Sequence, residues 1–338
     1  MASSGTPATA PRVAIVGAGL AGLACAAELT RRGASVTVFE QDSVPGGRAA
    51  TRVTEHGNFD FGAQFFTAQN HRFEAIAAGW TGAGLVKPWS GRMVAFSGGR
   101  LIEQTAKHMR QVGVPAMGEI ARHLAIGIDV RLSTTIEHVE TRSGLWQLHA
   151  SDRRTLAVRG FDALVMATPS PQAAVLLKGQ SALVDKIAAV QWVPCWAAMV
   201  SLVRSSGAGF AAAFVNDDPI LGWVSCDSAK PGRERIPGVA ERWVLHAKPR
   251  WSQDYIDMAP EQAGQWLLRA FSARLGRALK PRALTAYCWR HAIPVNPLSQ
   301  TCLWDSKRRV GFAGDWCGGP RLEGAYLSGL ALAEAMIA

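Results

Sequence analysis

Residues 13–40 read VAIVGAGLAGLACAAELTRRGASVTVFE, and this stretch decides the fold. It begins with the short apolar run Val13 to Val16, typical of a buried parallel strand, and glycines then follow in G-x-G-x-x-G spacing at Gly17, Gly19 and Gly22. In such a turn the first glycine allows the sharp bend, the second lets the backbone approach a pyrophosphate, and the third lets the following helix pack closely. The pattern therefore predicts a helix whose free N–H groups face a phosphate.

The second half of the stretch supports the same interpretation. The helix is predicted from Leu20 to Arg32, and Gly33 is a natural residue to follow its end. The second strand, Val36 to Phe39, ends at Glu40, whose carboxylate would accept hydrogen bonds from ribose hydroxyls. Because strand, glycines, helix, strand and acid agree, we predict a dinucleotide site rather than a chance βαβ unit. Its contacts are expected from Gly17, Gly19, Leu20, Ala21, Gly22, Glu40 and Gln41.

The glycine pattern serves NAD and FAD alike, so other segments must distinguish them. Pro45 to Arg48 reads PGGR, and its arginine could donate to the same pyrophosphate, although a surface turn has the same composition. Val310 to Asp315 reads as a short strand ending in Gly-Asp, where the aspartate could hold the ribityl or phosphate end of a flavin. The following segment, 321–337, is helical in composition and carries small residues that would permit close approach of a cofactor or simply pack the helix.

The order of these motifs resembles the FAD fold of the flavin amine oxidase superfamily and, within it, the bacterial renalases. The motifs are GAGLAG at 17–22, GGR at 46–48, ALVMATP at 163–169 and FAGDW at 312–316. Further stretches share the resemblance: GAQFFT at 62–67, WVLHA at 243–247 and WRH at 289–291. It implies noncovalent FAD, with further contacts from Gly47, Arg48, Gly62, Ala63, Gln64, Phe65, Thr168, Gly314, Asp315, Gly324 and Ala325.

The resemblance also implies an activity. Renalase-like enzymes oxidise isomeric (2- or 6-) dihydro-NAD(P) by hydride transfer to flavin N5, with dioxygen as acceptor, giving NAD(P)⁺ and hydrogen peroxide. Near the substrate we expect Gln64, His246, Arg290 and His291, although a single strand histidine is more often a core residue. Lys248 is a candidate for the lysine that many amine oxidases place near N5, and an exposed loop end is the alternative.

Two segments, 93–117 and 291–297, do not match bacterial renalases closely, so the substrate does not follow from the fold. Two other functions stay open: an amine oxidase or desaturase-like dehydrogenase acting on a small apolar substrate, and a non-catalytic flavin-binding redox sensor.

The expected architecture is α/β: a two-dinucleotide-binding, Rossmann-like FAD domain with an inserted α+β substrate domain built on an antiparallel sheet. After a flexible leader at 1–11, we assign 12–79, 119–175 and 288–338 to the FAD domain, and 80–118 and 176–287 to the substrate domain. Within the latter, strands are predicted at 196–203, 214–215, 221–225 and 243–248, with helices near 113–124 at its first boundary and at 261–279.

Composition excludes several function classes. The formal charge is +10, but the basic residues are dispersed without a long run, so nucleic-acid binding is not predicted. Neither a signal-peptide pattern nor a long apolar run is present, which favours a cytoplasmic protein without a membrane span. The six cysteines lack C-x-x-C or metal-ligand spacing, so free thiols and no metal are expected. The expected partners are a small-molecule substrate and dioxygen.

Overall fold

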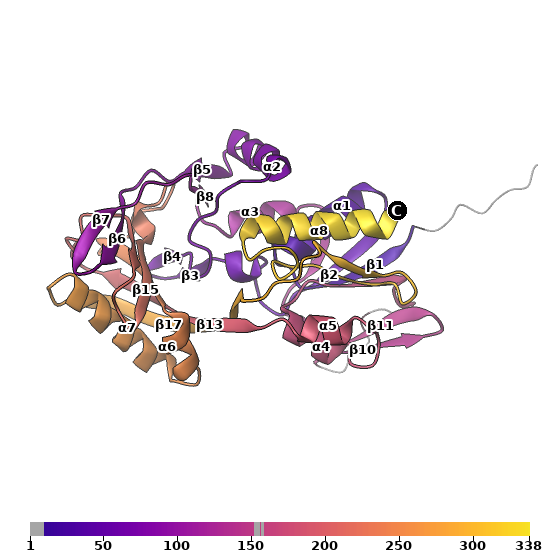
Figure 1. Cartoon of the computed structure of the whole chain (residues 1–338). Coiled ribbons are helices and arrows are strands. Elements are labelled where there is room, and N and C mark those ends of the chain that lie inside the picture. The colour runs from indigo at the N-terminus through magenta and orange to yellow at the C-terminus, as the bar shows by residue number, and fades with distance from the viewer. Residues whose placement is uncertain (1–9, 152–155, 157–158) are drawn as a thin grey trace, which may run out of the picture.

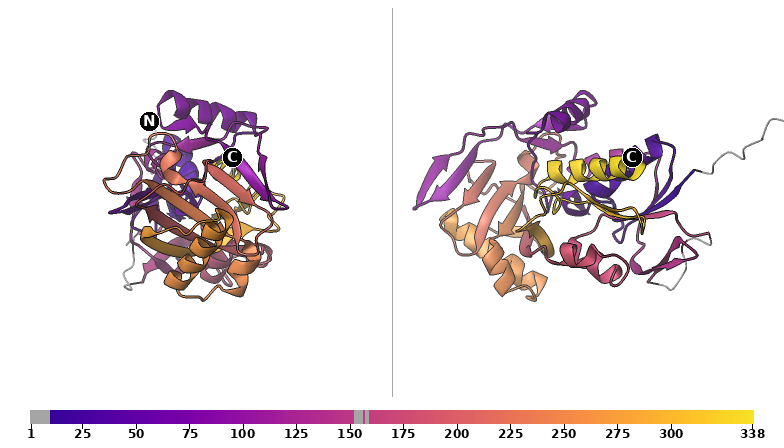
Figure 2. Two further views of the ribbon diagram at one scale, coloured as in Figure 1. Left: turned by 90° about the vertical axis from the view of Figure 1, so that its left-hand side faces the viewer. Right: turned by 45° about the vertical axis from the view of Figure 1, so that its right-hand side comes forward.

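The computed structural model of the chain describes residues 10–151, 156 and 159–338, so most of the predicted leader lies outside the described residues. Two large sheets occupy opposite ends of an elongated molecule, and the long strands β13, Trp192–Leu202, and β17, Pro281–Pro294, of the second sheet extend toward the first (Figures 1 and 2). Within the described residues, none of the helices combines the length and the apolar content needed to cross a membrane.

The first sheet has six strands in the order β18-β19-β12-β1-β2-β9. Their bounds are β1 Arg12–Val16, β2 Ser35–Phe39, β9 Asp129–Arg131, β12 Ala163–Met166, β18 Leu303–Asp305 and β19 Val310–Phe312. All neighbouring pairs are parallel except β18 with β19. The glycine-turn strand β1 therefore lies inside a parallel sheet, between β12 and β2.

Alternate residues of β1 face two cores, because successive side chains of a strand project to opposite sides. Val13 and Ile15 pack in a core with α1, Leu20–Arg31, and α8, Leu322–Ile337. Ala14 and Val16 pack on the other face, against the β10 and β11 hairpin and helices α4 and α5. The bounds of these elements are β10 Ile136–Arg142, β11 Leu145–Ala150, α4 Ser170–Leu176 and α5 Val184–Ala188.

The second sheet has seven strands in the order β17-β13-β16-β15-β14-β6-β7. Their bounds are β6 Met93–Ser97, β7 Arg100–Glu103, β13 Trp192–Leu202, β14 Ala212–Val215, β15 Leu221–Cys226, β16 Glu241–Ala247 and β17 Pro281–Pro294. Every pair is antiparallel except β14 with β6. Helices α6, Pro249–Asp254, and α7, Pro260–Arg274, cover one face, where Leu267 and Phe271 of α7 are buried.

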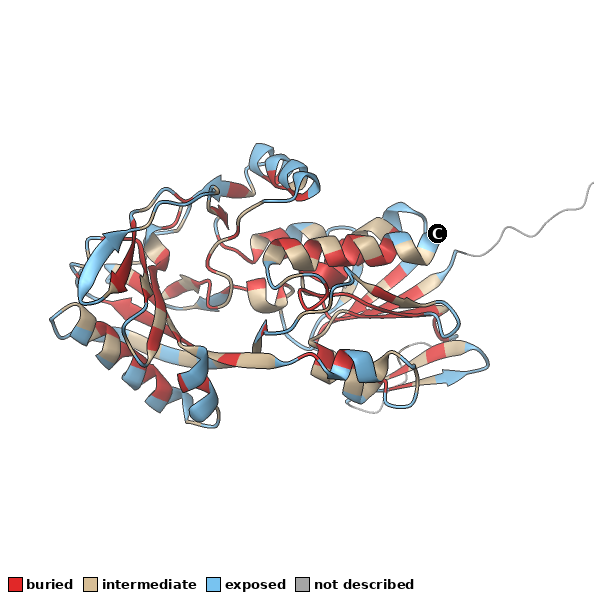
Figure 3. Ribbon diagram, viewed as in Figure 1, coloured by how far each residue is buried: buried red, intermediate tan, exposed pale blue. Residues whose placement is uncertain are grey.

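Shorter elements connect the two sheets. Helix α2 packs on α8 through ring contacts of Phe73 and Trp80 with Tyr326. Figure 3 shows buried residues in the strands of both sheets, whereas β7 and most of α2 are exposed. The remaining bounds are α2 His71–Gly82, α3 Glu119–Leu124, β3 Arg52–Thr54, β4 Gly57–Phe59, β5 Val86–Pro88, β8 Gln111–Gly113, and the 3-10 turns η1 Gly47–Ala49 and η2 Asp227–Ala229.

The predicted α/β fold class is confirmed, and the strands and helix of residues 13–40 fall within one or two residues of their predicted bounds. Other predictions need correction. The helix predicted to reach 279 ends at Arg274, and only 119–124 of the segment 113–124 is helical. Helix α2 and strand β17 were not predicted from the sequence. The boundary expected between residues 287 and 288 lies within β17, and the division into domains stays a prediction.

Candidate functional site

The glycine turn after β1 has three different environments. Gly17 has φ +106°, donates its N–H to the Phe39 carbonyl at 2.8 Å, and would place a Cβ 2.9 Å from the Ala167 oxygen. A Cβ on Gly22 would lie 2.0 Å from the oxygen of Gly17. At Gly19, by contrast, no described atom lies within 4 Å of an added Cβ, and no side chain caps α1 there. The second glycine therefore faces open space at a helix N-terminus, the geometry that binds phosphate.

Two other predicted segments lie against this turn. Gly46 donates its N–H to the Ala18 carbonyl at 2.9 Å, and a Cβ on Gly47 would lie 3.6 Å from the Gly19 Cα. Ala63 donates its N–H to the Arg48 carbonyl at 2.8 Å. These contacts bring together the predicted residues Gly17, Gly19, Leu20, Ala21, Gly22, Gly47, Arg48, Gly62 and Ala63.

Glu40 lies at the end of β2, as predicted, and its carboxylate is buried against the turn. One oxygen accepts the Ala18 N–H at 2.7 Å and the other accepts the Asp42 N–H at 3.0 Å. Burial raises the pKa of Glu40, and these backbone hydrogen bonds oppose that shift. Gln41 is exposed beside it. Glu40 thus braces the turn, and its predicted contact with ribose stays a prediction.

Thr168 carries a polar atom that lacks a partner. Its Oγ1 is buried and makes no hydrogen bond with the described residues, while its methyl lies 3.4 Å from the position of a Cβ on Gly17. A buried hydroxyl without a partner costs about 1–3 kcal/mol, so a ligand atom or water is the usual neighbour of such a group. The unpartnered hydroxyl therefore lies where the glycine turn predicts a ligand.

Arg48 and Asp315 contact each other across the predicted site. The guanidinium nitrogens lie 2.7 and 2.6 Å from the two carboxylate oxygens, and one also donates to the Ala292 carbonyl at 3.1 Å. The same guanidinium lies 5.0 Å from the ring centroid of Trp192, whose ring meets His291 edge-on at 5.9 Å. Burial lowers the pKa of His291, and the nearby guanidinium of Arg48 lowers it further. Arg48 and Asp315, which were predicted to hold the cofactor, therefore lie near His291, which was predicted to lie near the substrate.

The remaining C-terminal residues are fixed by close backbone packing. Gly314 donates its N–H to the Ser328 hydroxyl at 2.9 Å. A Cβ on Gly324 would lie 2.2 Å from the Gly319 oxygen, and Ala325 follows in the first turn of α8. The start of α8 is thus held against the loop that follows Asp315.

Gln64 has its amide bonded entirely within the chain. Its nitrogen donates to the Gly62 carbonyl at 3.1 Å and to the Asp60 carbonyl. Its oxygen accepts from the Ser225 hydroxyl at 2.6 Å and from the Lys230 ammonium at 3.2 Å. The expected contact of Gln64 with a substrate stays a prediction, because these partners use both amide atoms.

Lys230 belongs to a buried ionic cluster that no sequence motif indicated. Its Nζ lies 2.7 Å from Asp227 Oδ1 and 3.1 Å from Asp60 Oδ2, and Arg233 also pairs with Asp60. Burial alone would raise the pKa of Asp60, but the two cations outweigh it and hold that pKa low. Lys248, the lysine considered from sequence, instead donates to an exposed carbonyl, that of Asn216, at 2.9 Å. The cluster ties β15 and η2 of the second sheet to the segment that carries Gln64.

His246 and Trp289 share one acceptor. The His246 Nε2 and the Trp289 Nε1 lie 3.0 and 3.1 Å from the Phe61 carbonyl oxygen, and the Phe61 ring stacks on Trp289 at 4.7 Å. Burial lowers the pKa of His246 to about 4, so the ring is neutral at pH 7 and donates from Nε2. Arg290 lies apart from this group, because its side chain is 57% exposed and pairs with Asp257 at the surface.

Phe65 lies in an aromatic group on the second sheet's side of the molecule. Its ring contacts Trp89 and Trp223 at 6.3 and 5.7 Å, and the Arg110 guanidinium lies 5.6 Å from its centroid. Among the described residues, no cluster of three or more histidine, cysteine or carboxylate side chains is suited to a metal ion.

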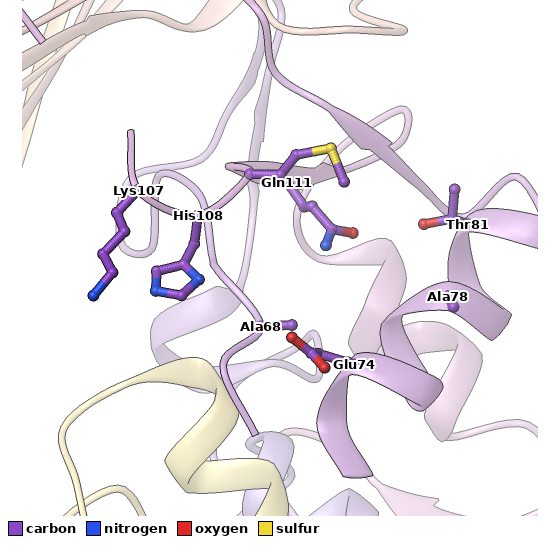
Figure 4. Close-up of a pocket in the computed structure, with 8 residues that line it drawn as sticks. Ala68, Glu74, Ala78, Thr81, Lys107, His108 and Gln111 are labelled. Atoms are coloured by element: carbon purple, nitrogen blue, oxygen red, sulfur yellow. The ribbon is translucent and has the colours of Figure 1, made fainter. Parts of the chain in front are cut away.

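A separate cavity of about 510 Å³ lies between α2 and the segment that leads into β8 (Figure 4). In the close-up, Glu74 and Thr81 come from α2, while Lys107, His108 and Gln111 come from the opposite side. None of its lining residues is a predicted site residue. The lining residues are Ala68, Glu74, Ala78, Thr81, Lys107, His108, Met109 and Gln111.

Residues 15–79 match the model of the NAD(P)-binding Rossmann-like domain family. Similar solved structures include a protein assigned as a protoporphyrinogen oxidase from Exiguobacterium sp. 255-15, with 12% identity and a TM-score of 0.72 over 97% of this chain and 99% of that one. Putrescine oxidase bound to putrescine has 14% identity and a TM-score of 0.69, over 97% and 99%. Cyclohexylamine oxidase from Brevibacterium oxydans IH-35A has 13% identity and a TM-score of 0.68, over 97% of this chain and 98% of that one. At these identities the comparison shows a shared fold along nearly the whole chain.

Proposed function

We propose that this protein is an FAD-dependent oxidoreductase. The observation that carries the proposal is the contrast among the three turn glycines: two are required by packing, while Gly19 alone faces open space at the N-terminus of α1. The unpartnered hydroxyl of Thr168 beside this turn fits the same ligand. A dinucleotide would supply the anionic oxygens that a helix N-terminus stabilises.

FAD explains more of the arrangement than NAD does. The βαβ unit alone would serve a nicotinamide dinucleotide, but Arg48 and Asp315 converge beside it from segments far apart in sequence. Helix α8 also approaches α1 so closely that a Cβ on Gly329 would lie 2.0 Å from the Ala21 oxygen. A bound FAD would supply a two-electron sink, and the chain would hold it through the backbone of the glycine turn, Arg48, Thr168 and Asp315.

The cofactor is proposed to be noncovalent. Cys317 is the cysteine next to the Gly-Asp segment, and burial raises its pKa to about 12. A thiol is a poor nucleophile until it ionises, so this side chain is unsuited to attack a flavin ring at neutral pH. Acid precipitation that releases the yellow colour into solution is the expected result; colour retained in the pellet would contradict it.

As substrate we propose an isomeric (2- or 6-) dihydro-NAD(P), with dioxygen as the electron acceptor and NAD(P)⁺ and hydrogen peroxide as products. A dihydropyridine regains aromaticity when it loses hydride, so this reaction needs no acid or base from the protein. The predicted substrate residues suit that chemistry, because Gln64 is fully hydrogen-bonded and His246 is neutral and held by the Phe61 carbonyl. Their role is then to fix the shape of the site.

Amine oxidation is the second candidate, and the fold shared with putrescine oxidase and cyclohexylamine oxidase favours it. An amine must reach the cofactor as the neutral base, which calls for an environment that lowers its pKa. The aromatic group of Phe61, Tyr287 and Trp289 is a candidate surface for such a substrate.

An anaerobic experiment separates the candidates. The yellow protein is mixed with dihydronicotinamide isomers, with ordinary NADH, and with putrescine or cyclohexylamine, while the flavin band is followed. Bleaching by the isomers alone, reversed on admitting air with release of peroxide, is the expected result. Bleaching by an amine alone would replace the proposed substrate, and purified protein that binds no flavin would refute the proposal as a whole.

A further inference from the structure

Arg110 lies immediately before β8, between the cavity beside α2 and the aromatic group around Phe65. The next residue, Gln111, forms a two-way backbone bridge with Phe66, with N···O distances of 2.9 and 2.8 Å. Gln111 lines the cavity beside α2 (Figure 4). Because successive residues of an extended segment project to opposite sides, Arg110 points away from that cavity. Its guanidinium accordingly lies 5.6 Å from the ring centroid of Phe65.

The guanidinium of Arg110 has no hydrogen-bond acceptor and no acidic partner among the described residues. Several arginines of the chain are paired instead: Arg48 with Asp315, Arg92 with Glu103 and Arg233 with Asp60. Arg110 is also partly buried, and this burial lowers its pKa. A guanidinium carries five N–H donors. No nitrogen of Arg110 is both buried and without a partner, so these donors stay open to solvent or to a ligand. The chain therefore leaves a cation uncompensated beside Phe65.

The neighbouring side chains also supply donors without acceptors. Trp89 and Trp223, which both contact the Phe65 ring, are 5% and 8% exposed, and the N–H of each indole lacks a partner among the described residues. The buried carboxylates of Asp60 and Asp227 are already neutralised by Lys230 and Arg233. The surroundings of Phe65 thus combine an apolar wall with unused donors, which suits a ligand that is both planar and anionic.

We propose that Arg110 binds the anionic oxygens of the substrate, with Phe65, Trp89 and Trp223 forming the apolar surface beside them. A forked guanidinium matches the geometry of a phosphate or a carboxylate. This inference rests on the proposed function in taking the Phe65 side as the substrate side, and it deepens that function. The pyrophosphate of a dihydronicotinamide dinucleotide has the required charge. A cationic amine such as putrescine does not, because an uncompensated guanidinium repels an ammonium group.

The test measures binding without turnover. Oxidised, flavin-loaded protein is titrated with NAD⁺, with nicotinamide riboside, which has no phosphate, and with benzoate as a carboxylate, following the flavin spectrum. In the Arg110→Gln variant, Kd for NAD⁺ should rise about 10–100-fold, the range of one lost charge-assisted hydrogen-bond pair, while Kd for the riboside stays unchanged. Lys107→Gln is the matched control, because Lys107 is exposed on the same segment and lines the cavity on the other side. It should leave both Kd values unchanged.

Each other outcome has a defined meaning. A weakened affinity for benzoate but not for NAD⁺ would keep the anion site and identify its ligand as a carboxylate. Unchanged affinity for both anions would overturn the inference, and so would a loss of bound flavin, since Arg110 would then hold the cofactor. If Arg110→Gln does not fold, Arg110→Lys, which keeps the charge but loses the fork, provides the same comparison with a smaller expected change.

The failure of this inference can be told apart from the failure of the proposed function. If no dihydronicotinamide isomer bleaches the flavin, but Arg110→Gln still weakens anion binding, the substrate proposal fails and the anion site stands. If the isomers are oxidised with equal kcat/KM by the wild type and by Arg110→Gln, the activity stands and the role of Arg110 is refuted.

Discussion

Replacing Lys230 by Met tests how the ionic cluster beneath the candidate site is held together. The side chain of Lys230 is fully buried, with its ammonium 2.7 Å from Asp227, 3.1 Å from Asp60 and 3.2 Å from Gln64. Methionine keeps most of the apolar stem but removes the charge. Two buried carboxylates would then share one remaining buried partner, Arg233.

The expected cost is large. Removing one partner of a buried ion pair typically costs about 3–5 kcal/mol, because the other charge stays buried without compensation. At roughly 2 °C per kcal/mol, which suits a chain of this size, the thermal midpoint should fall by about 6–10 °C.

The pH dependence has a definite sign. In the wild type the cations hold the pKa of Asp60 low against the effect of burial. This carboxylate therefore contributes stability above its unfolded-state pKa of about 4. The contribution is lost as the pH falls through the lowered folded-state pKa. Without Lys230, burial should dominate and raise the pKa of Asp60. The variant can then take up a proton on folding as the pH falls. Its deficit relative to the wild type should therefore be largest at neutral pH and should shrink toward pH 4.

The assay is denaturant unfolding followed by tryptophan fluorescence at pH 7.5 and pH 5, with flavin content measured in parallel. Lys248→Met is the control, because Lys248 donates only to the exposed Asn216 carbonyl and its loss should change stability by about 0.5 kcal/mol or less. A Lys230→Met variant within about 1 kcal/mol of the wild type at pH 7.5, well under the cost of a broken buried pair, would refute the reasoning. A deficit that grows on acidification would refute it equally.

Three further predictions concern single positions. Gly19→Ala should keep the wild-type thermal midpoint but bind FAD at least tenfold more weakly, whereas Gly22→Ala should unfold, because its Cβ would lie 2.0 Å from a backbone oxygen. Thermal melts and flavin titration measure the two effects, and an unchanged FAD affinity in Gly19→Ala would show that the turn binds no phosphate. The pKa of His246, about 4 when folded, implies that stability falls by up to about 3 kcal/mol between pH 6.5 and 4, as the unfolded chain takes up a proton that the folded chain does not. His246→Gln should flatten this part of the pH profile, and an unchanged slope contradicts the assignment. Arg290→Ala should leave both the thermal midpoint and kcat/KM unchanged, since its ion pair with Asp257 is exposed; a tenfold loss of kcat/KM would show that it reaches the substrate.

The local parts of the fold were predictable from sequence because their signals are local. The turn glycines, α1 and β2 lie within one run of residues, and each glycine's environment follows from contacts inside that run or with the adjacent strand. Helix α2 could also have been predicted. Asn70 caps its first turn, and Phe73, Ala77 and Trp80 repeat at helical spacing and are all buried.

Contacts between distant segments were not predictable in the same way. Arg48 and Asp315 are separated by 267 positions, and each was assigned a cofactor role from its own motif without any sign that the two would pair. Lys230 and Lys248 look equivalent in sequence, since each follows a strand of the second sheet. Folding brings Asp60, Gln64 and Asp227 around the Lys230 ammonium and buries it, whereas the Lys248 ammonium donates to an exposed carbonyl.

The same limit explains which polar residues were chosen from sequence. Motif positions such as Gln64 and His246 are recognisable, but both amide atoms of Gln64 and the Nε2 of His246 are bonded within the chain, so they shape the site. Thr168 and Arg110 have bonding capacity left over, and Arg110 carries no motif at all. A buried atom without a partner, such as Thr168 Oγ1, costs free energy unless a ligand satisfies it, and an unpaired cation such as Arg110 attracts an anion. Such groups indicate binding more directly than residue type does. Whether a polar side chain has unused hydrogen-bonding capacity depends on neighbours that folding brings together. The sequence could therefore predict the cofactor turn but not Arg110, the residue proposed to bind the substrate's anionic oxygens.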